Sequence, residues 1–469
     1  MEQDLIERFR KIVGSAHAIT DQALIAPYLV EERGRFHGKT PLLLRPSSCA
    51  EVSSIMQLAS QTHTPIVPQG GNTGLVGGQQ PDENVCSILL SMERLNKIRS
   101  INLEGNFAVV EAGVILQDLQ KKADESGRLF PLSLGSEGSC QIGGNLSSNA
   151  GGTAVIAYGN MRELCLGLEV VLPDGHILDD LRFVKKDNSG YDLKNLFIGA
   201  EGTLGIITAA VLKLFPKPKE IAVAFVGLRS PAKALEFLSL AQSQGGGMLT
   251  GFELMSKLSL QMSLSYNMCE RSPFEHEHEW YVLINISSLL GDGEALSVLS
   301  IILEKALNDT VIDDAIIAQS LKQQDFFWQL RESISYAQKL AGGTIKHDIA
   351  VPIASIPDFI DEAALIVEEI APSARVVCFG HLGDGNLHYN ITQPVGADTA
   401  AFLQLWPQMN HRIHSLVMHY QGTFSAEHGI GQLKREELRA FKSPVALDIM
   451  QKIKEILDPL GIMNPGKIL

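Results

Sequence analysis

The sequence predicts an α+β protein with more than one domain, and three observations support this. The chain has 469 residues, which is too long for a single hydrophobic core. Strand-like and helix-like segments alternate from Thr40 onward, and tight turns such as Asp174-Gly175 join strand pairs, which favours antiparallel sheet. Pro216 and Pro218 then interrupt the pattern before it restarts, so we expect a boundary near residue 218.

Before this boundary, we expect a helix at the N-terminus followed by short alternating elements. Ser48 and Glu51 have the spacing of a capping box, which predicts a helix from there to about Gln61. Apolar runs predict strands at 41–46, 65–68, 86–92 and 107–113. A helix is expected at 115–127 and a hairpin at 167–178.

After the boundary, the same reasoning predicts strands at 221–228 and 280–288 and a strand pair at 375–392. Helices are expected at 230–244, 293–307 and 356–370, with one long helix at about 325–341. This order suggests a sheet with helices on one face, and the chain after Thr399 is expected to be mostly helical.

Composition argues against several classes of protein. The formal net charge of −14, without a basic stretch, argues against nucleic-acid binding. No apolar run is long enough to cross a membrane, and residues 1–14 resemble neither a signal peptide nor a transit peptide. The six cysteines are scattered without C-x-x-C spacing, which predicts reduced thiols in a cytoplasmic protein. They are Cys49, Cys86, Cys140, Cys165, Cys269 and Cys378.

Two glycine-rich loops, at 68–78 and 131–152, are the most distinctive stretches. Both combine glycine with small polar residues and neither contains lysine, so a bound phosphate would be held by backbone amides and hydroxyls. Apolar residues such as Leu134 and Ile142 distinguish these loops from flexible linkers. The G-x-G-x-x-G fingerprint and the phosphate loop with lysine are both absent, which argues against an ordinary Rossmann or P-loop site. The loops predict a cofactor site without identifying the cofactor.

A second group of residues suggests metal chemistry. His381 and His388 flank a tight turn, and Glu427-His428 follows about forty residues later. Two imidazoles and a carboxylate with an open position suit a catalytic divalent ion. An ordinary turn with an unrelated Glu-His pair explains the same spacing equally well.

Arg331 and Ser335 form a third group, since a four-residue spacing places them on one face of the expected helix. Lys346 begins a strand-like segment that follows. Taken alone, these residues are best explained as ordinary surface charges.

The motifs PQGGNTGLVGG, GSCQIGGNLSSNAGG, YGN and GAEGTLGIIT resemble the flavin-binding half of FAD enzymes of the vanillyl-alcohol-oxidase type. More narrowly, they resemble the D-2-hydroxyacid dehydrogenases, and the match continues to the C-terminus. The resemblance implies a two-part FAD-binding domain at 1–218 and a substrate or cap domain with an antiparallel sheet at 219–424. A helical C-terminal segment at 425–469 would return to the FAD domain.

The resemblance also implies which residues bind FAD. These are Pro68, Gly70, Gly71, Asn72, Thr73, Gly74, Leu75, Gly135, Gly138, Ser139, Ile142, Gly143, Gly144, Asn145, Ser148, Asn149, Ala150, Gly151, Tyr158, Gly159, Glu201, Gly205, Ile206 and Asn464. Neither loop contains a histidine, which flavin-linking relatives often carry there, so we expect FAD to be noncovalent.

By the same resemblance, HLGDGNLH and EHGIG are metal-binding motifs. Their metal ligands would be His381, His388 and Glu427, with zinc favoured and manganese and iron left open. His428 would accept the substrate proton, and Asn390 would contact the substrate. Arg331, Ser335 and Lys346 would hold a distal carboxylate, with serine here replacing the family's threonine.

Together these features predict an FAD-dependent dehydrogenase that oxidises D-2-hydroxyglutarate, and D-malate as a further candidate. Lys346 disfavours a D-lactate or glycolate enzyme of the same fold, which remains the alternative. A metal-dependent hydrolase would leave the glycine loops unexplained, and a noncatalytic flavin-holding subunit would leave the His/His/Glu/His set unexplained. Electron-transfer flavoprotein, a quinone or a cytochrome could accept the electrons, and a homodimer is an open possibility.

Overall fold

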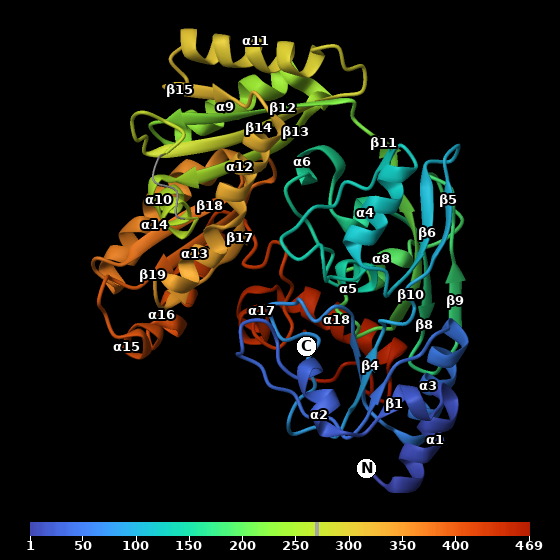
Figure 1. Ribbon diagram of the computed structural model, residues 1–469. Helices are drawn as coiled ribbons and strands as arrows, with labels where there is room; N and C mark the ends of the chain where they lie inside the picture. Colours follow the sequence, from blue (N-terminus) through green and yellow to red (C-terminus); the bar gives the residue numbers. More distant parts are fainter. Residues whose placement is uncertain (268–271) are drawn as a thin grey trace. The chain divides into compact units, whose positions relative to one another are not determined.

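The computed structural model describes residues 1–267 and 272–469, and its contacts divide the chain into two compact units (Figure 1). Unit 1 comprises residues 1–151, 159–217 and 427–469. Unit 2 comprises residues 152–158 and 218–426. Cys269 lies outside the described residues, and the other five cysteines are free thiols.

The first sheet of unit 1 has four short strands in the order β1-β2-β4-β3. β1 (Ala18–Ile19) is antiparallel to β2 (Leu43–Leu44), whereas β4 (Ile88–Ser91) runs parallel to both β2 and β3 (Ile66–Gln69). Apolar residues of α1 (Gln3–Val13) and α3 (Cys49–Thr62) pack on this sheet and form one core. The smaller helices nearby are η1 (Ser15–His17), α2 (Gln22–Ile25) and η2 (Ala26–Tyr28).

Helix α3 confirms the predicted N-cap, because the Ser48 hydroxyl accepts a hydrogen bond from the Glu51 N–H (3.2 Å). The second hydrogen bond of the expected capping box, from the Ser48 N–H to the Glu51 carboxylate, is replaced by another. The Glu51 carboxylate accepts from the N–H of Ser47 (2.8 Å) rather than from that of Ser48. The cap therefore satisfies an additional donor before the helix.

The second sheet of unit 1 is antiparallel, with strand order β5-β6-β10-β8-β9. Its strands are β5 (Ile98–Asn102), β6 (Phe107–Glu111), β8 (Cys165–Val171), β9 (Ile177–Asp180) and β10 (Ile206–Lys213). The predicted hairpin is confirmed, since β8 and β9 pair around Gly175 with φ of 88°. The other elements of unit 1 within residues 116–216 are short. They are α4 (Leu116–Glu125), β7 (Arg128–Leu129), α5 (Ile142–Ser147), α7 (Met161–Leu164), α8 (Lys194–Phe197) and β11 (Phe215–Pro216).

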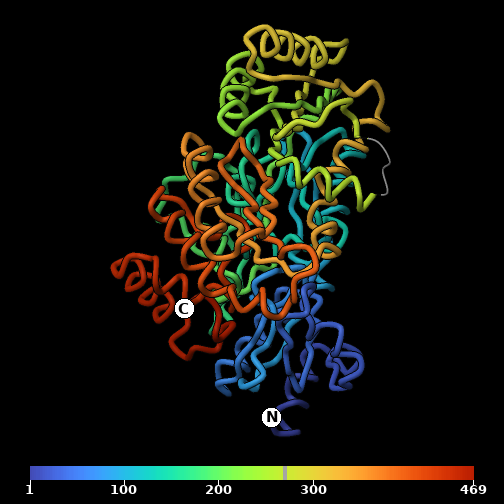
Figure 2. The backbone as a smooth tube through the Cα atoms, turned by 90° about the vertical axis from the view of Figure 1, so that its left-hand side faces the viewer, coloured from blue at the N-terminus to red at the C-terminus, as the bar shows by residue number. Residues whose placement is uncertain are grey.

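The C-terminal segment of the chain belongs to unit 1. It contains α17 (Arg435–Phe441) and α18 (Pro444–Leu457) and ends beside β3, where Ile66 forms a parallel bridge with Met463. Figure 1 shows these red helices near the blue N-terminal strands of the same unit, and Figure 2 marks both ends of the chain. Among the described residues, no helix is long and apolar enough to cross a membrane.

Unit 2 is built on one eight-stranded antiparallel sheet with the order β15-β12-β14-β13-β18-β19-β16, in which β17 also pairs with β19. Its strands are β12 (Glu220–Leu228), β13 (Leu249–Ser256), β14 (Trp280–Ser288), β15 (Asp314–Ile317), β16 (Thr344–Ile345), β17 (Asp348–Ala350), β18 (Arg375–His381) and β19 (Asn386–Thr392). The expected strand pair at 375–392 is confirmed as β18 and β19, joined by the turn η5 (Leu382–Asp384).

Helices cover both faces of this sheet, so the prediction of helices on one face is wrong. One core is formed with α9 (Pro231–Gly245), α11 (Glu294–Asn308), α14 (Ile356–Ile370) and α16 (Trp406–His419). The opposite core is formed with α10 (Lys257–Tyr266), α12 (Leu321–Glu332) and α13 (Ile334–Leu340). The signal was present in the sequence, because β12 alternates residues of both cores and reads as a continuous apolar run.

The long helix predicted at about 325–341 is two helices. α12 ends and α13 begins at Ser333, a buried residue whose hydroxyl lies 2.7 Å from the Asn267 amide nitrogen and 2.8 Å from the Ser263 hydroxyl. The other short elements of unit 2 are α6 (Val155–Tyr158), η3 (Gly246–Met248), η4 (Ile353–Ser355) and α15 (Thr399–Leu403).

Candidate functional site

The two glycine-rich loops of unit 1 lie against each other. A Cβ on Gly71 would stand 2.0 Å from the Ser139 carbonyl oxygen, and one on Gly70 would stand 3.6 Å from Gln141. A side chain at Gly71 is therefore incompatible with this packing. Residues about seventy positions apart thus form one surface of closely packed backbone.

Two further segments that the sequence singled out join the same place. The N–H of Gly199 donates to Leu146 (3.0 Å) and that of Glu201 donates to Ser147 (2.8 Å), which ties GAEGTLG to helix α5. The Asn464 amide donates to the carbonyls of Gly78 (2.9 Å) and Glu201 (2.8 Å). Four stretches predicted from the sequence therefore converge within unit 1.

The predicted flavin residues are distributed over this region as follows. Residues 68–75 include the end of β3 and the loop after it, while residues 135–151 include the second loop and α5. Gly205 and Ile206 lie at the start of β10, and Gly159 precedes α7. Tyr158 ends α6 and is the exception, since it belongs to unit 2.

The backbone here is unusual, because several predicted residues that are not glycine have positive φ. Asn72, Asn149, Glu201 and Asn464 have φ of 57°, 52°, 49° and 44°. Such conformations cost free energy and concentrate at functional sites. Their grouping in one region supports a binding function for it.

Buried acceptors without partners test whether this region fits FAD. The side-chain oxygens of Gln141, Asn145 and Asn464 are buried and have no hydrogen-bond partner among the described residues. Unpartnered buried polar atoms are rare, since each costs free energy. A flavin nucleotide carries an imide N–H, an amino group and hydroxyls that can donate to such acceptors. The residues present therefore fit FAD.

A second group of polar residues is positioned by strand register in unit 2. Asp348 pairs directly with His388 across β17 and β19, and the register of β16 with β19 extends the same alignment to Lys346 and Asn390. Directly opposite residues project from the same face of a sheet. Lys346, Asp348, His388 and Asn390 therefore share the face covered by α10, α12 and α13.

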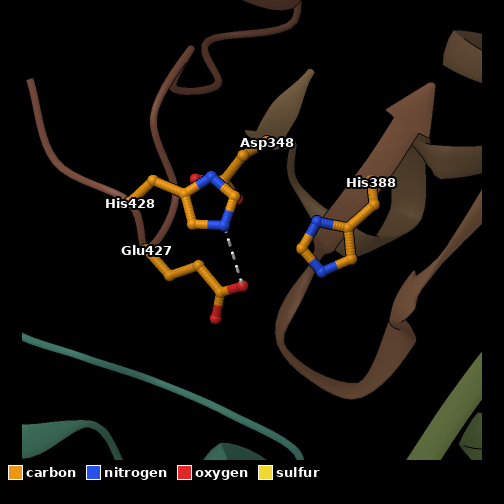
Figure 3. Close-up of side chains that lie close together, drawn as sticks. All are labelled: Asp348, His388, Glu427 and His428. Atoms are coloured by element: carbon orange, nitrogen blue, oxygen red, sulfur yellow. Dashed lines mark ion pairs between the residues drawn. The ribbon is translucent and has the colours of Figure 1, made fainter. Parts of the chain in front are cut away.

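The loop that begins at Glu427 starts beside these strands. Thr423 forms a bridge with Ala350, and the N–H of Ala426 donates to the Asp348 carbonyl (3.3 Å). Glu427 and His428 follow directly, and their side chains lie 3.7 Å apart. Ligand atoms of Asp348, His388, Glu427 and His428 all lie within 4.8 Å of one another, and Figure 3 shows the four side chains gathered in one place.

This donor set fits a divalent metal. Two imidazoles and two carboxylates are nitrogen and oxygen ligands suited to zinc or manganese. Two of the four residues, His388 and Glu427, are the predicted ligands. His428 was predicted as a proton acceptor, and Asp348 was not predicted at all.

His381, the third predicted ligand, lies next to this cluster rather than in it. Its ring centroid is 5.7 Å from that of His388, with the rings nearly perpendicular. Its Nδ1 lies 2.7 Å from Oε1 of Glu253, which is opposite His381 in the register of β13 and β18. The other Glu253 oxygen accepts from Nε of Arg331 (2.8 Å) and lies 2.7 Å from its Nη2.

Carboxylates make the surroundings of the two histidines negative. Burial opposes ionisation of Glu253, but the interactions with His381 and Arg331 outweigh it and hold the pKa of this carboxyl below its usual value. Asp348 is buried and accepts from the Asn386 amide (3.1 Å). Burial raises the pKa of Asp384, in the turn between the histidines, to about 6. Such a concentration of carboxylates favours a cation.

Arg331 and Ser335, expected on one helix, lie on two different helices. Arg331 is buried near the end of α12, with its guanidinium 4.8 Å from the Phe379 ring centroid. Ser335 is exposed on α13, after the break at Ser333. Asn390 is buried, and its amide donates to Gln338 of α13 (3.0 Å).

Sequence reasoning missed Glu253 and Asp348. Each is an acidic residue within an otherwise apolar strand segment, FELM and DIAV, and a charge buried there requires a partner. The partners are separated by many residues in sequence, and only the strand register identifies them.

Two protein-family models match parts of this chain. Residues 40–180 match the FAD binding domain family and residues 217–468 match the C-terminal domain of FAD linked oxidases. The chain belongs to the FAD linked oxidases. It is 37% identical to the D-2-hydroxyglutarate dehydrogenase of Bos taurus over 100% of this chain and 84% of the relative.

Other relatives carry related names. The chain is 35% identical to a putative D-lactate dehydrogenase of Schizosaccharomyces pombe, over 99% of this chain and 90% of the relative. The structure of p-cresol methylhydroxylase has a TM-score of 0.79 at 15% identity and covers 99% of this chain and 96% of that one. The predicted vanillyl-alcohol-oxidase type fold and the prediction of an FAD-dependent D-2-hydroxyacid dehydrogenase are confirmed.

The predicted cytoplasmic location is wrong by this comparison, because both relatives are named as mitochondrial proteins. The prediction relied on scattered cysteines and on the composition of residues 1–14. Reduced thiols show that a compartment is reducing and do not distinguish one such compartment from another.

Proposed function

We propose that this enzyme oxidises D-2-hydroxyglutarate to the corresponding 2-oxo acid and depends on a divalent metal as well as FAD. The observation that carries the proposal is the single sheet face bearing Asp348, His388, Asn390 and Lys346. A metal centre and a lysine side chain for a second carboxylate on one face suit a dicarboxylic hydroxy acid.

The residues of the chain would divide the work as follows. His388 and Glu427, with His381 or Asp348, hold the metal, and His428 accepts the proton of the C2 hydroxyl. A bound metal ion supplies a Lewis acid that lowers the pKa of this hydroxyl. Bound FAD supplies the hydride acceptor.

Lys346 is the proposed contact for the distal carboxylate, since it is half-buried and shares the face of His388. Asn390 lies opposite it and would orient the substrate. Arg331 is held by Glu253 through Nε and Nη2, so any contact with substrate would use the rest of its guanidinium. Ser335 is exposed on α13, and we propose it for this clamp on resemblance alone.

In the flavin region, we propose that the backbone of the two loops and the acceptors of Gln141, Asn145 and Asn464 bind FAD without a covalent bond. Acid precipitation should release the flavin from the chain. Flavin that stays attached to the denatured protein would contradict this.

Dye-coupled turnover on D- and L-2-hydroxyglutarate, D-malate, D-lactate and glycolate, with and without chelator, tests the proposal. We expect the highest kcat/KM with D-2-hydroxyglutarate, and loss of turnover with chelator. A higher kcat/KM with D-lactate would favour the second candidate, to which the name of the Schizosaccharomyces pombe relative points. The electron acceptor would be electron-transfer flavoprotein, a quinone or a cytochrome.

A further inference from the structure

Glu253 occupies a position that the proposed chemistry leaves unexplained. Its side chain is fully buried in β13, next to the buried apolar residues Phe252 and Leu254. Taking a carboxylate out of water costs several kcal/mol unless charges and hydrogen bonds offset the loss. A buried carboxylate at this position therefore calls for an explanation in terms of its partners.

The partners lie on two other elements and occupy both oxygens. Oε1 is 2.7 Å from Nδ1 of His381, which stands directly opposite on β18. Oε2 accepts from Nε of Arg331 (2.8 Å) on α12 and lies 2.7 Å from its Nη2. Arg331 is itself buried, 7% exposed, so its charge balances that of Glu253 away from water.

This arrangement decides which nitrogen of His381 can bind a metal. A carboxylate only accepts hydrogen bonds, so the Nδ1 that faces Glu253 must carry the proton. In the neutral ring, Nε2 then has the lone pair. Metal-binding histidines commonly donate their second nitrogen to a carboxylate in this way, which fixes the ring and makes it a stronger ligand.

We propose that Glu253 is a positioning residue for the metal centre. It holds His381 in the tautomer with Nε2 unprotonated and turned to the metal, and Arg331 holds Glu253. The inference rests on the proposed function, because it requires a metal site that includes His381. It assigns Arg331 a task other than clamping substrate.

Glu253→Gln tests the inference because it keeps the volume and removes the charge. The amide nitrogen can donate to Nδ1, which places the proton of His381 on Nε2 and blocks ligation. We expect the dissociation constant for Zn²⁺ and for Mn²⁺ to rise about tenfold to a hundredfold. The measurement is competition with a chromophoric chelator on metal-stripped, FAD-loaded protein, with the FAD content of each variant determined in parallel.

Glu169→Gln is the matched control. Glu169 is also a buried carboxylate that pairs with an arginine, since Arg99 Nη1 and Nη2 lie 3.2 and 3.0 Å from its two oxygens. It lies in unit 1 and has no place in the proposed metal site. Metal affinity in this control should equal that of the wild type, and an equal loss in both variants would overturn the inference.

A double variant guards against misfolding, since Glu253→Gln leaves Arg331 buried without its partner. The double variant Glu253→Leu with Arg331→Met removes both partners of the ion pair at once. Such a replacement by apolar residues is often neutral for stability. We expect this variant to fold with full FAD content and to bind metal as weakly as Glu253→Gln. Wild-type metal affinity in the folded double variant would overturn the inference.

The tautomer itself gives a readout that does not involve metal. In metal-free protein labelled with ¹⁵N-histidine, the ring of His381 should show a protonated Nδ1 in the wild type and not in Glu253→Gln. A protonated Nε2 in the wild type would overturn the inference and leave the proposed function standing. A wild-type protein that binds neither metal ion would overturn the proposed function and this inference with it.

Discussion

The two candidate regions of this enzyme are built from different kinds of residues. In unit 1 the proposed flavin region uses glycines, small polar residues and left-handed backbone, and its contacts are mostly hydrogen bonds of the main chain. The residues that unit 2 contributes to the proposed metal region are histidines and carboxylates paired across strands, His381 with Glu253 and His388 with Asp348. A flavin nucleotide is large and needs close approach of backbone, whereas a metal needs a few charged ligands.

This difference predicts that a mutation can weaken the binding of one cofactor without affecting the other. Under the proposed function, side chains of the sheet face would contribute to chemistry, and the backbone of the loops would contribute to flavin affinity. Each prediction below either confirms this separation or breaks it.

The largest effect is expected for His388→Ala. His388 is a ligand predicted from the sequence motif, and it also lies in the four-residue cluster. Its loss should lower kcat/KM by more than the tenfold to hundredfold typical of residues that only support a metal ligand. Absorbance of the purified protein should show unchanged FAD content, because His388 lies in unit 2. Loss of flavin in proportion to activity would break the separation.

Lys346→Ala should act on substrate preference. A charged hydrogen bond to a carboxylate contributes about 1.5–3 kcal/mol, so kcat/KM for D-2-hydroxyglutarate should fall about tenfold to a hundredfold. The rate with D-lactate should change little, since D-lactate has no distal carboxylate. Lys305→Ala, at an exposed lysine of α11, is the control. Equal losses for both substrates would mean that Lys346 supports the fold or the metal instead.

Gly71→Ala should act on the flavin region alone. The added Cβ would collide with the Ser139 carbonyl and force the two loops apart, at a cost of about 1–3 kcal/mol. We expect weaker FAD binding and unchanged metal affinity. Gly247→Ala, where a Cβ meets nothing within 4 Å, is the matched control. Reduced metal affinity in Gly71→Ala would show that the two regions are not independent.

Glu201→Gln tests a contact between a predicted flavin residue and the loop that carries His428. The half-buried Glu201 carboxylate accepts from the N–H groups of Ile430 (2.7 Å) and Gly431 (2.8 Å), two and three residues after the proposed base His428. An amide can satisfy one of these donors and faces the other with its own N–H, which costs about 1–3 kcal/mol. We expect a roughly tenfold fall in kcat from poorer alignment of His428. Unchanged kcat would show that the loop is held by its other contacts.

The smallest effect concerns pH. Burial is the main reason that the pKa of Lys467 falls from 10.5 to about 8. The folded state therefore binds this proton less tightly than the unfolded state, and the free energy of unfolding should rise as pH increases from about 8 toward 10.5. Urea unfolding of the wild type and Lys467→Met at several pH values checks this. An identical pH dependence in both would contradict it.

The sequence identifies most of the proposed flavin region because the signals there are local. Glycine and asparagine are required where the backbone adopts positive φ or packs without a Cβ, as at Gly71 and Asn72, so the motif and the conformation coincide in sequence. The convergence of Asn464 with Gly78 follows from the resemblance and not from any local pattern.

The proposed metal region is less predictable because its signals are not local. His381 and His388 flank a visible turn, but their partners Glu253 and Asp348 are recognised only when β13 and β17 take their register. A shift of one residue would turn either carboxylate to the opposite face. The helix break at Ser333 likewise depends on hydrogen bonds from Asn267 and Ser263, which the sequence around 325–341 does not reveal.

Metal removal with flavin retained is the most direct test of the central claim. FAD-loaded enzyme should be treated with chelator and desalted. Turnover of D-2-hydroxyglutarate, FAD absorbance and metal content should then be measured before and after a divalent ion is returned. The account predicts loss of turnover with unchanged FAD absorbance, and recovery when the ion is restored. Full turnover in metal-free enzyme, or release of FAD together with the metal, would contradict it.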